Sequence, residues 1–69
     1  MVEVFKTNVQ KAAEANKIIS QLNRFFPDSK INFDLEDCDK ILRVEGRNIT
    51  VEKVVELVQK HGFNCAELE

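Results

Sequence analysis

The feature that most constrains the fold is a repeated change of hydrophobic period within a short chain. From Lys11 to Phe25, apolar residues recur at steps of three and four, the spacing of an amphipathic helix. A second stretch with helical spacing runs from Val51 to Val58. Around both stretches lie short segments in which apolar and polar residues alternate, which is the period of a half-buried strand.

Four segments are predicted as strands: residues 2–6, 30–35, 41–46 and 63–68. In the first, Val2 and Val4 are expected on one face, with Phe5 as a further apolar residue. The second and third are separated only by the polar turn 36–40, so they are expected to form a hairpin.

Local signals mark the ends of the helices. Asn8 and Thr50 are residue types that cap helix N-termini, and each precedes a helical stretch. Pro27 disfavours helical geometry at the residue before it and so ends the first helix. The pair His61–Gly62 is expected to close the second, with the histidine in its last turn and the glycine just after it.

The order strand–helix–strand–strand–helix–strand predicts an α+β fold, the ferredoxin-like βαββαβ sandwich. Right-handed crossovers give a four-stranded antiparallel sheet in the order 4-1-3-2, with both helices on one face. We expect a single domain over residues 1–69, and residues 7–11, 36–40 and 61–63 should meet at one end of it. The expected core cluster is Ile18, Leu22, Phe33, Leu42, Val44, Val54 and Val58.

Charge and composition argue against several classes of partner. The net charge is −2 and the ten basic residues form no run, which disfavours nucleic-acid binding. No apolar stretch is long enough to cross a bilayer, so no membrane insertion is expected. The first residues, "MVEVFK", lack the features of a signal peptide, and a cytoplasmic location is the default expectation.

Most of the chain resembles the heavy-metal-associated domains, the fold of small copper chaperones and of the amino-terminal modules of copper-transporting ATPases. The similar segments are "VFKTNVQKAAEANKI", "INFDLEDCDKILRVEG", "ITVEKVVELVQKHGF" and "AEL", with "DKILRVEG" and "EKVVELVQKHGF" the strongest. The resemblance implies a role in metal transport. In that family the first loop carries Cys-x-x-Cys, whose soft thiolates suit Cu(I).

This chain departs from the family pattern at the metal loop, because it contains no Cys-x-x-Cys. The resemblance places Lys11 and Glu14 where the two cysteines would stand, with Ala12 and Ala13 between them. A protonated lysine has no lone pair to offer, and a carboxylate is a hard ligand that does not suit Cu(I). We therefore expect a degenerate metal site, with no metal and no other cofactor bound there.

Three other residues could take part in metal chemistry. Cys38 lies at the tip of the acidic hairpin, Cys65 lies in the last strand, and His61 is the only histidine. Each also has an ordinary structural reading, as an exposed turn residue, a small buried residue and a helix-terminal residue respectively. The two cysteines belong to opposite edges of the predicted sheet, so a disulfide between them is not expected.

Two functions remain open, and no catalytic constellation supports an enzyme. The first is a non-catalytic module that contacts another protein, or regulates one, through the end that carries the metal loop. Its expected surface is Lys6, Lys11, Glu14, Asp37, Cys38 and Phe63. A weak homodimer, in which the acidic hairpin of one copy meets Lys11 of another, is a variant of this reading. The alternative is metal binding or transport with the non-standard ligands Cys38, Cys65, His61 and Glu14.

Overall fold

The helices and strands follow the predicted order. The computed structural model describes residues 1–68, and Glu69, the last residue of the expected domain, lies outside the described residues. The elements are β1 (Val2–Thr7), α1 (Ala12–Phe25), β2 (Lys30–Asp34), β3 (Ile41–Glu45), α2 (Val51–Lys60) and β4 (Cys65–Glu67). Neither of the two helices in this part of the chain has the length and apolar character needed to cross a membrane.

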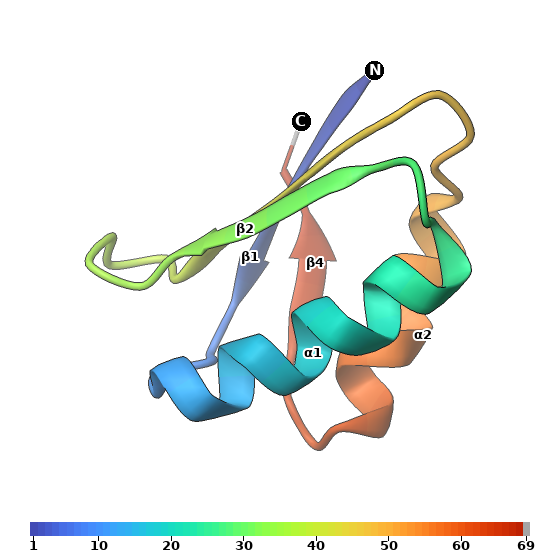
Figure 1. The fold of residues 1–69 in the computed structure, drawn as a ribbon. Helices are drawn as coiled ribbons and strands as arrows, with labels where there is room; N and C mark the ends of the chain where they lie inside the picture. Colours follow the sequence, from blue (N-terminus) through green and yellow to red (C-terminus); the bar gives the residue numbers. More distant parts are fainter. Residues whose placement is uncertain (69) are drawn as a thin grey trace.

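The four strands form one antiparallel sheet in the order β2-β3-β1-β4, and both helices cover the same face (Figure 1). β1 lies between β3 and β4, with Val4 opposite Arg43 and Lys6 opposite Ala66. β2 pairs with β3 alone, in a register that places Phe33 opposite Leu42. The predicted ferredoxin-like fold and strand order are therefore confirmed.

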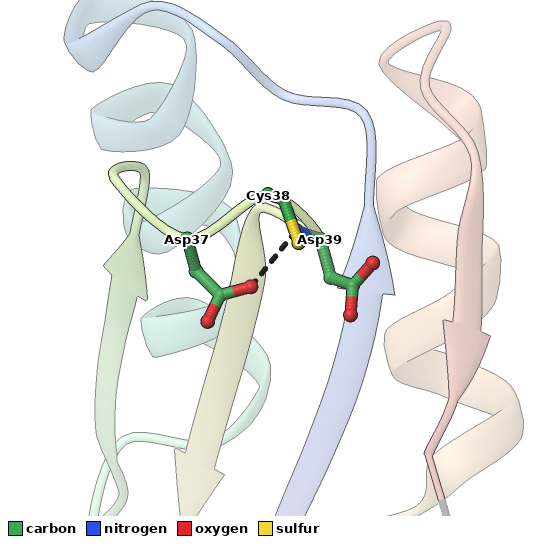
Figure 2. Close-up of side chains that lie close together, drawn as sticks. All are labelled: Asp37, Cys38 and Asp39. Carbon is green, nitrogen blue, oxygen red and sulfur yellow. Dashed lines mark hydrogen bonds between the residues drawn. The ribbon is translucent and has the colours of Figure 1, made fainter.

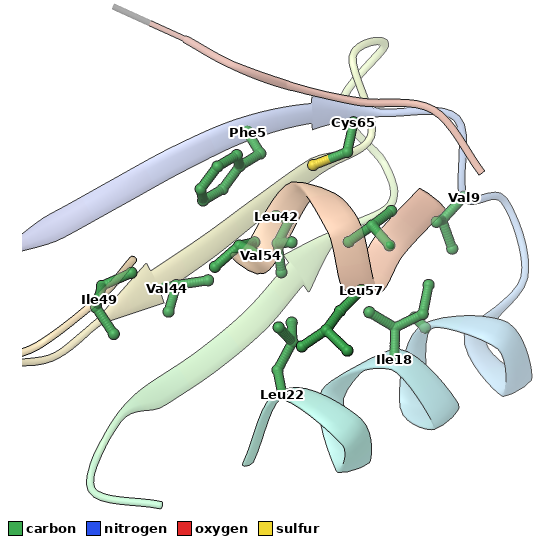
Figure 3. Close-up of a cluster of buried hydrophobic side chains, with 12 residues drawn as sticks. Phe5, Val9, Ile18, Leu22, Leu42, Val44, Ile49, Val54, Leu57 and Cys65 are labelled. Carbon is green, nitrogen blue, oxygen red and sulfur yellow. The ribbon is translucent and has the colours of Figure 1, made fainter. Parts of the chain in front are cut away.

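The core fills the space between the sheet and the helices (Figure 3). Six of the seven predicted core residues are fully buried, and the exception is Phe33, which is half-buried because β2 is an edge strand. The buried hydrophobic residues are Phe5, Val9, Ala15, Ile18, Leu22, Leu42, Val44, Ile49, Val54, Leu57, Val58 and Cys65. Loops therefore contribute to the core through Val9 and Ile49, which the helical and strand periods do not reveal.

The structure shows which face of β1 is the inner one. Val2 is 51% exposed, whereas Phe5 is completely buried and Thr7 is 6% exposed, so the inner face carries the odd-numbered residues. Val2 and Val4 lie on the face of the sheet away from the helices. An open sheet face tolerates β-branched residues, because their strand preference does not depend on full burial.

Of the two predicted N-caps, Asn8 is wrong and Thr50 is confirmed in position. α1 begins at Ala12 with Lys11 in the N-cap position, and Asn8 is too far upstream to act as its cap. Thr50 does occupy the N-cap position of α2, but its side chain makes no capping hydrogen bond. At the other end of α2 the prediction is confirmed: Gly62 follows the helix with a φ of 90°, a left-handed conformation that favours glycine.

Candidate functional site

Three connecting segments meet at one end of the sheet, as predicted. They are residues 8–11 between β1 and α1, residues 35–40 between β2 and β3, and residues 61–64 between α2 and β4, and we call them together the loop end. The backbone N–H of Asn64 donates to Oδ1 of Asn8 at 2.7 Å, which joins the first and third segments. Asn8 thus fixes a loop instead of capping a helix.

The second segment is joined to the end of β1. The backbone N–H of Thr7 donates to the carbonyl oxygen of Asp39 at 3.0 Å. Nζ of Lys6 lies 3.5 Å from Oδ1 of Asp39, an exposed ion pair that contributes little by itself. The hairpin turn is therefore held beside the start of the β1–α1 loop, although the two segments are distant in sequence.

Thr7 is the buried polar residue at the centre of this arrangement. Its hydroxyl donates to the carbonyl oxygen of Lys40 and accepts from the backbone N–H of Val9 at 3.3 Å. The Thr7 hydroxyl thus forms hydrogen bonds with one backbone group of the hairpin turn and one backbone group of the segment between β1 and α1. Sequence reasoning missed this role, and the only signal for it was a hydroxyl residue where the first strand ends.

The hairpin turn also has hydrogen bonds of its own. Its last residue, Lys40, has a positive φ of 46°, which is uncommon outside glycine. The backbone N–H of Lys40 donates to the carbonyl oxygen of Asp37 at 3.0 Å, and its Nζ donates to the carbonyl oxygen of Leu35 at 2.7 Å. These bonds hold the turn in one conformation, so the groups at its tip have defined positions.

The two expected ligand positions lie at the start of α1. Lys11, the N-cap residue, is exposed and has an extended backbone, and Glu14 is half-buried in the first helical turn. Ala12 and Ala13 already belong to the helix, as their helix propensity predicts. An ammonium group and a carboxylate do not form a site for Cu(I), which takes soft sulfur ligands.

Lys11 and Glu14 are not joined to each other. In residues 1–68 the ion pairs are Lys6 with Asp39 and Lys53 with Glu56. The carboxylate of Glu14 lies in the first turn of α1, where the helix dipole favours a negative charge. Both side chains therefore remain accessible for contact with another molecule.

Cys38 lies exposed at the tip of the hairpin between two acidic residues (Figure 2). The backbone N–H of Asp39 donates to Oδ1 of Asp37 at 2.8 Å, a local hydrogen bond that spans Cys38. One ligand atom from each of Asp37, Cys38 and Asp39 lies within 4.8 Å of the others. In the part of the chain that the structure describes, this is the one group of three or more potential metal-ligating side chains.

Cys65 has a different environment, since it is 9% exposed and belongs to the core. Burial raises the pKa of its thiol from 9.0 to about 11, because a thiolate is poorly solvated there. Cys65 is therefore a neutral thiol at ordinary pH and is not a ready metal ligand. Both cysteines are free, as expected for residues at opposite edges of the sheet.

His61 and Phe63 complete the loop end. His61 is the exposed C-cap residue of α2, where the dipole favours a cation. Phe63 is half-buried and packs against the core, so only part of its ring faces solvent. Among residues 1–68 the structure does not gather Cys38, Cys65, His61 and Glu14 into a site, and the ligand set of the alternative prediction is not assembled.

Comparisons with known proteins agree with the fold. The chain is similar to the yeast copper transporter domain CCC2A, whose solution structure was determined in the apo and Cu(I)-loaded states. The TM-score is 0.84, and the match covers 99% of this chain and 94% of that domain at 21% sequence identity. No protein-family model matches the chain, and no curated protein matches it either.

At this level of identity the similarity establishes the fold. The expected resemblance to a copper-chaperone-type domain is therefore confirmed for the architecture, while activity must be argued from this chain's own residues.

Proposed function

We propose that this chain is a non-catalytic protein-interaction or regulatory module, which keeps the fold of a copper-transfer domain without its copper ligands. The proposal is supported by the pair Lys11 and Glu14 at the start of α1, the positions where the family resemblance would place the two soft thiolates. The chain forms one domain, and its free cysteines suit a reducing compartment such as the cytoplasm.

The loop end is the proposed docking surface. Its exposed groups include the side chain of Lys11, the Cys38 thiol and part of the Phe63 ring, and the ammonium of Lys6 lies beside it at the end of β1. Asp39 of the hairpin lies 3.5 Å from Lys6, so the surface combines both signs of charge with the partly exposed Phe63 ring. Such patterns steer the orientation of an encounter more than they increase affinity.

The conformation of this surface supports the proposal further. Thr7 and Asn8 connect the three segments of the loop end by hydrogen bonds to Lys40 and Asn64. A surface that is already ordered loses less conformational entropy when a partner binds. Because little entropy is lost, even the small surface of this domain can support a weak contact with another protein.

Two-dimensional proton–nitrogen correlation spectra of the isotope-labelled protein test the docking surface. Addition of extract from the native cell should shift the amide signals of Lys11, Asp37 and Phe63, and Lys11→Glu should weaken the effect. Lys17→Glu, which alters an exposed lysine farther along α1, is the matched control and should leave the shifts in place. If signals of the loop end stay still while the spectrum is otherwise intact, the docking surface is wrong.

The group Asp37, Cys38 and Asp39 favours a second candidate function, metal handling through the hairpin. One thiol flanked by two carboxylates suits a borderline ion such as Zn(II) better than Cu(I). Zn(II) titration against a chelator should then give binding that Cys38→Ser abolishes and Cys65→Ser does not. Equal binding by the wild type and Cys38→Ser would eliminate this candidate.

A further inference from the structure

The outer edge of β2 offers a second interaction surface, separate from the loop end. β2 is a terminal strand of the sheet, and within residues 1–68 it pairs only with β3. Its other side therefore presents backbone N–H and C=O groups that no strand in this described part of the chain uses. An edge strand of this kind is a template for pairing with another strand.

The sequence of β2, "KINFD", is complementary to itself in the antiparallel direction. If two copies pair about a two-fold axis at Asn32, Lys30 of each copy lies opposite Asp34 of the other. The same register overlaps the complete strands and puts Ile31 opposite Phe33. Opposite charges directly across an antiparallel pair are stabilising, whereas like charges are destabilising.

Among residues 1–68 the charged ends of β2 form no ion pair, although Lys30 lies opposite Glu45 of β3 in the sheet register. Lys30 and Asp34 are both exposed, and neither belongs to the ion pairs found among residues 1–68. Asp34 accepts one hydrogen bond through Oδ1, from the backbone N–H of Glu36 at 3.2 Å. A carboxylate has a second oxygen, so this bond leaves Asp34 able to accept from a lysine.

The face of β2 that points toward the core also favours association, through burial of apolar side chains. Ile31 and Phe33 pack against the core but are only half-buried, because no strand lies beyond them. A second copy of β2 would cover both side chains and bring its own Phe33 against Ile31. Aromatic and β-branched residues form favourable cross-strand pairs.

The opposite edge of the sheet does not have these properties. β4 has three residues, Cys65–Glu67, whereas β2 has five. A short edge strand is one of the ways in which proteins avoid edge-to-edge pairing. The sequence Cys-Ala-Glu also has no pair of opposite charges related by a central residue.

We propose that two copies of this chain associate through β2, in antiparallel register about Asn32, to form one continuous sheet. The interface consists of one strand from each copy with Ile31, Phe33 and the two Lys30–Asp34 pairs. One five-residue strand from each copy makes an interface at the low end of the size range of specific protein contacts, so the dimer is weak and reversible. It does not depend on the docking surface at the loop end.

Charge reversal on β2 gives a sharp test by sedimentation velocity over a range of protein concentrations at low salt. Wild type should dimerise with rising concentration. Lys30→Asp alone, or Asp34→Lys alone, puts like charges opposite each other and should weaken the dimer by about tenfold or more. The double variant Lys30→Asp/Asp34→Lys restores opposite charges and should dimerise again.

Mixing the two single variants is the most specific arm. One then carries two acidic ends and the other two basic ends, so they should form a heterodimer although each alone stays monomeric. Circular dichroism verifies that each variant is folded. As a second readout on the wild type, amide exchange at Ile31 and Phe33, whose N–H groups point away from β3, should slow as concentration rises, whereas exchange at Asn32, whose N–H points toward β3, should not.

Three results would overturn the proposal. One is a wild type that remains monomeric into the millimolar range. Another is a dimer that is insensitive to both single reversals. The third is a dimer that only Lys11→Glu disrupts, because this would place self-association at the loop end and not at β2.

Discussion

Replacement of Thr7 by valine should lower the free energy of unfolding by about 2–3 kcal/mol. Valine has nearly the same shape as threonine, so the packing around this 6% exposed side chain is preserved while its hydroxyl is lost. Two hydrogen bonds disappear, one to the carbonyl oxygen of Lys40 and one from the backbone N–H of Val9.

The magnitude follows from the burial of these groups. A typical hydrogen bond contributes about 1 kcal/mol net, and a buried group that loses its partner costs about 1–3 kcal/mol. Val9 is completely buried, so water cannot easily replace the lost hydroxyl at its N–H. For a chain of 69 residues the whole stability is roughly 3–10 kcal/mol, which makes the loss easily measurable.

Urea unfolding followed by circular dichroism measures this effect. Thr7→Ser is the matched control: it keeps the hydroxyl and removes one methyl group, which should cost only about 1 kcal/mol. The valine variant should therefore be less stable than the serine variant. Two results would show that Thr7 does not hold the loop end together. One is a Thr7→Val variant that unfolds at the same urea concentration as the wild type, and the other is a Thr7→Ser variant that is less stable than Thr7→Val.

Two further predictions concern the core. Leu22→Ala should cost about 2–5 kcal/mol, because Leu22 is completely buried between α1 and the sheet; an unchanged denaturation midpoint would contradict the packing of α1. The pKa of about 11 for Cys65 predicts that alkylation, read by mass spectrometry, modifies Cys38 first and Cys65 only at strongly alkaline pH or after unfolding; equal rates at neutral pH would refute its burial. Because the folded pKa of Cys65 is raised, its contribution to stability is fully present below about pH 9 and decreases as the pH rises towards 11.

The sequence predicted the architecture because its hydrophobic periods are clear in α1, α2 and the β2–β3 hairpin. Which face of β1 points to the core could not be predicted in the same way. Valines lie on its outer face, and the buried Thr7 shares the inner face with Phe5. In a sheet with one open face, apolar residues are stable on either side, so their positions alone do not identify the core.

The candidate site was predictable only in outline. Topology brought the three loops to one end, but the role of Thr7 depends on the carbonyl of Lys40, 33 residues away. A contact of that kind follows from the register of the hairpin against β1, which local sequence does not specify. The hydrogen bond of the Asn8 side chain was missed for the same reason, since its partner Asn64 lies 56 residues away.

The central proposal is that this chain has the fold of the copper transporter domain to which it is similar, that Lys11 and Glu14 occupy the ligand positions, and that it therefore carries no copper. Titration with Cu(I) in competition with a chromogenic chelator tests it most directly, on the wild type, on Lys11→Cys/Glu14→Cys and on Lys11→Ser/Glu14→Ser as the matched control. The account predicts that only the double-cysteine variant removes one Cu(I) per chain from the chelator. A wild type that binds Cu(I) equally well would contradict the account, and a folded double-cysteine variant that binds none would show that these are not the ligand positions.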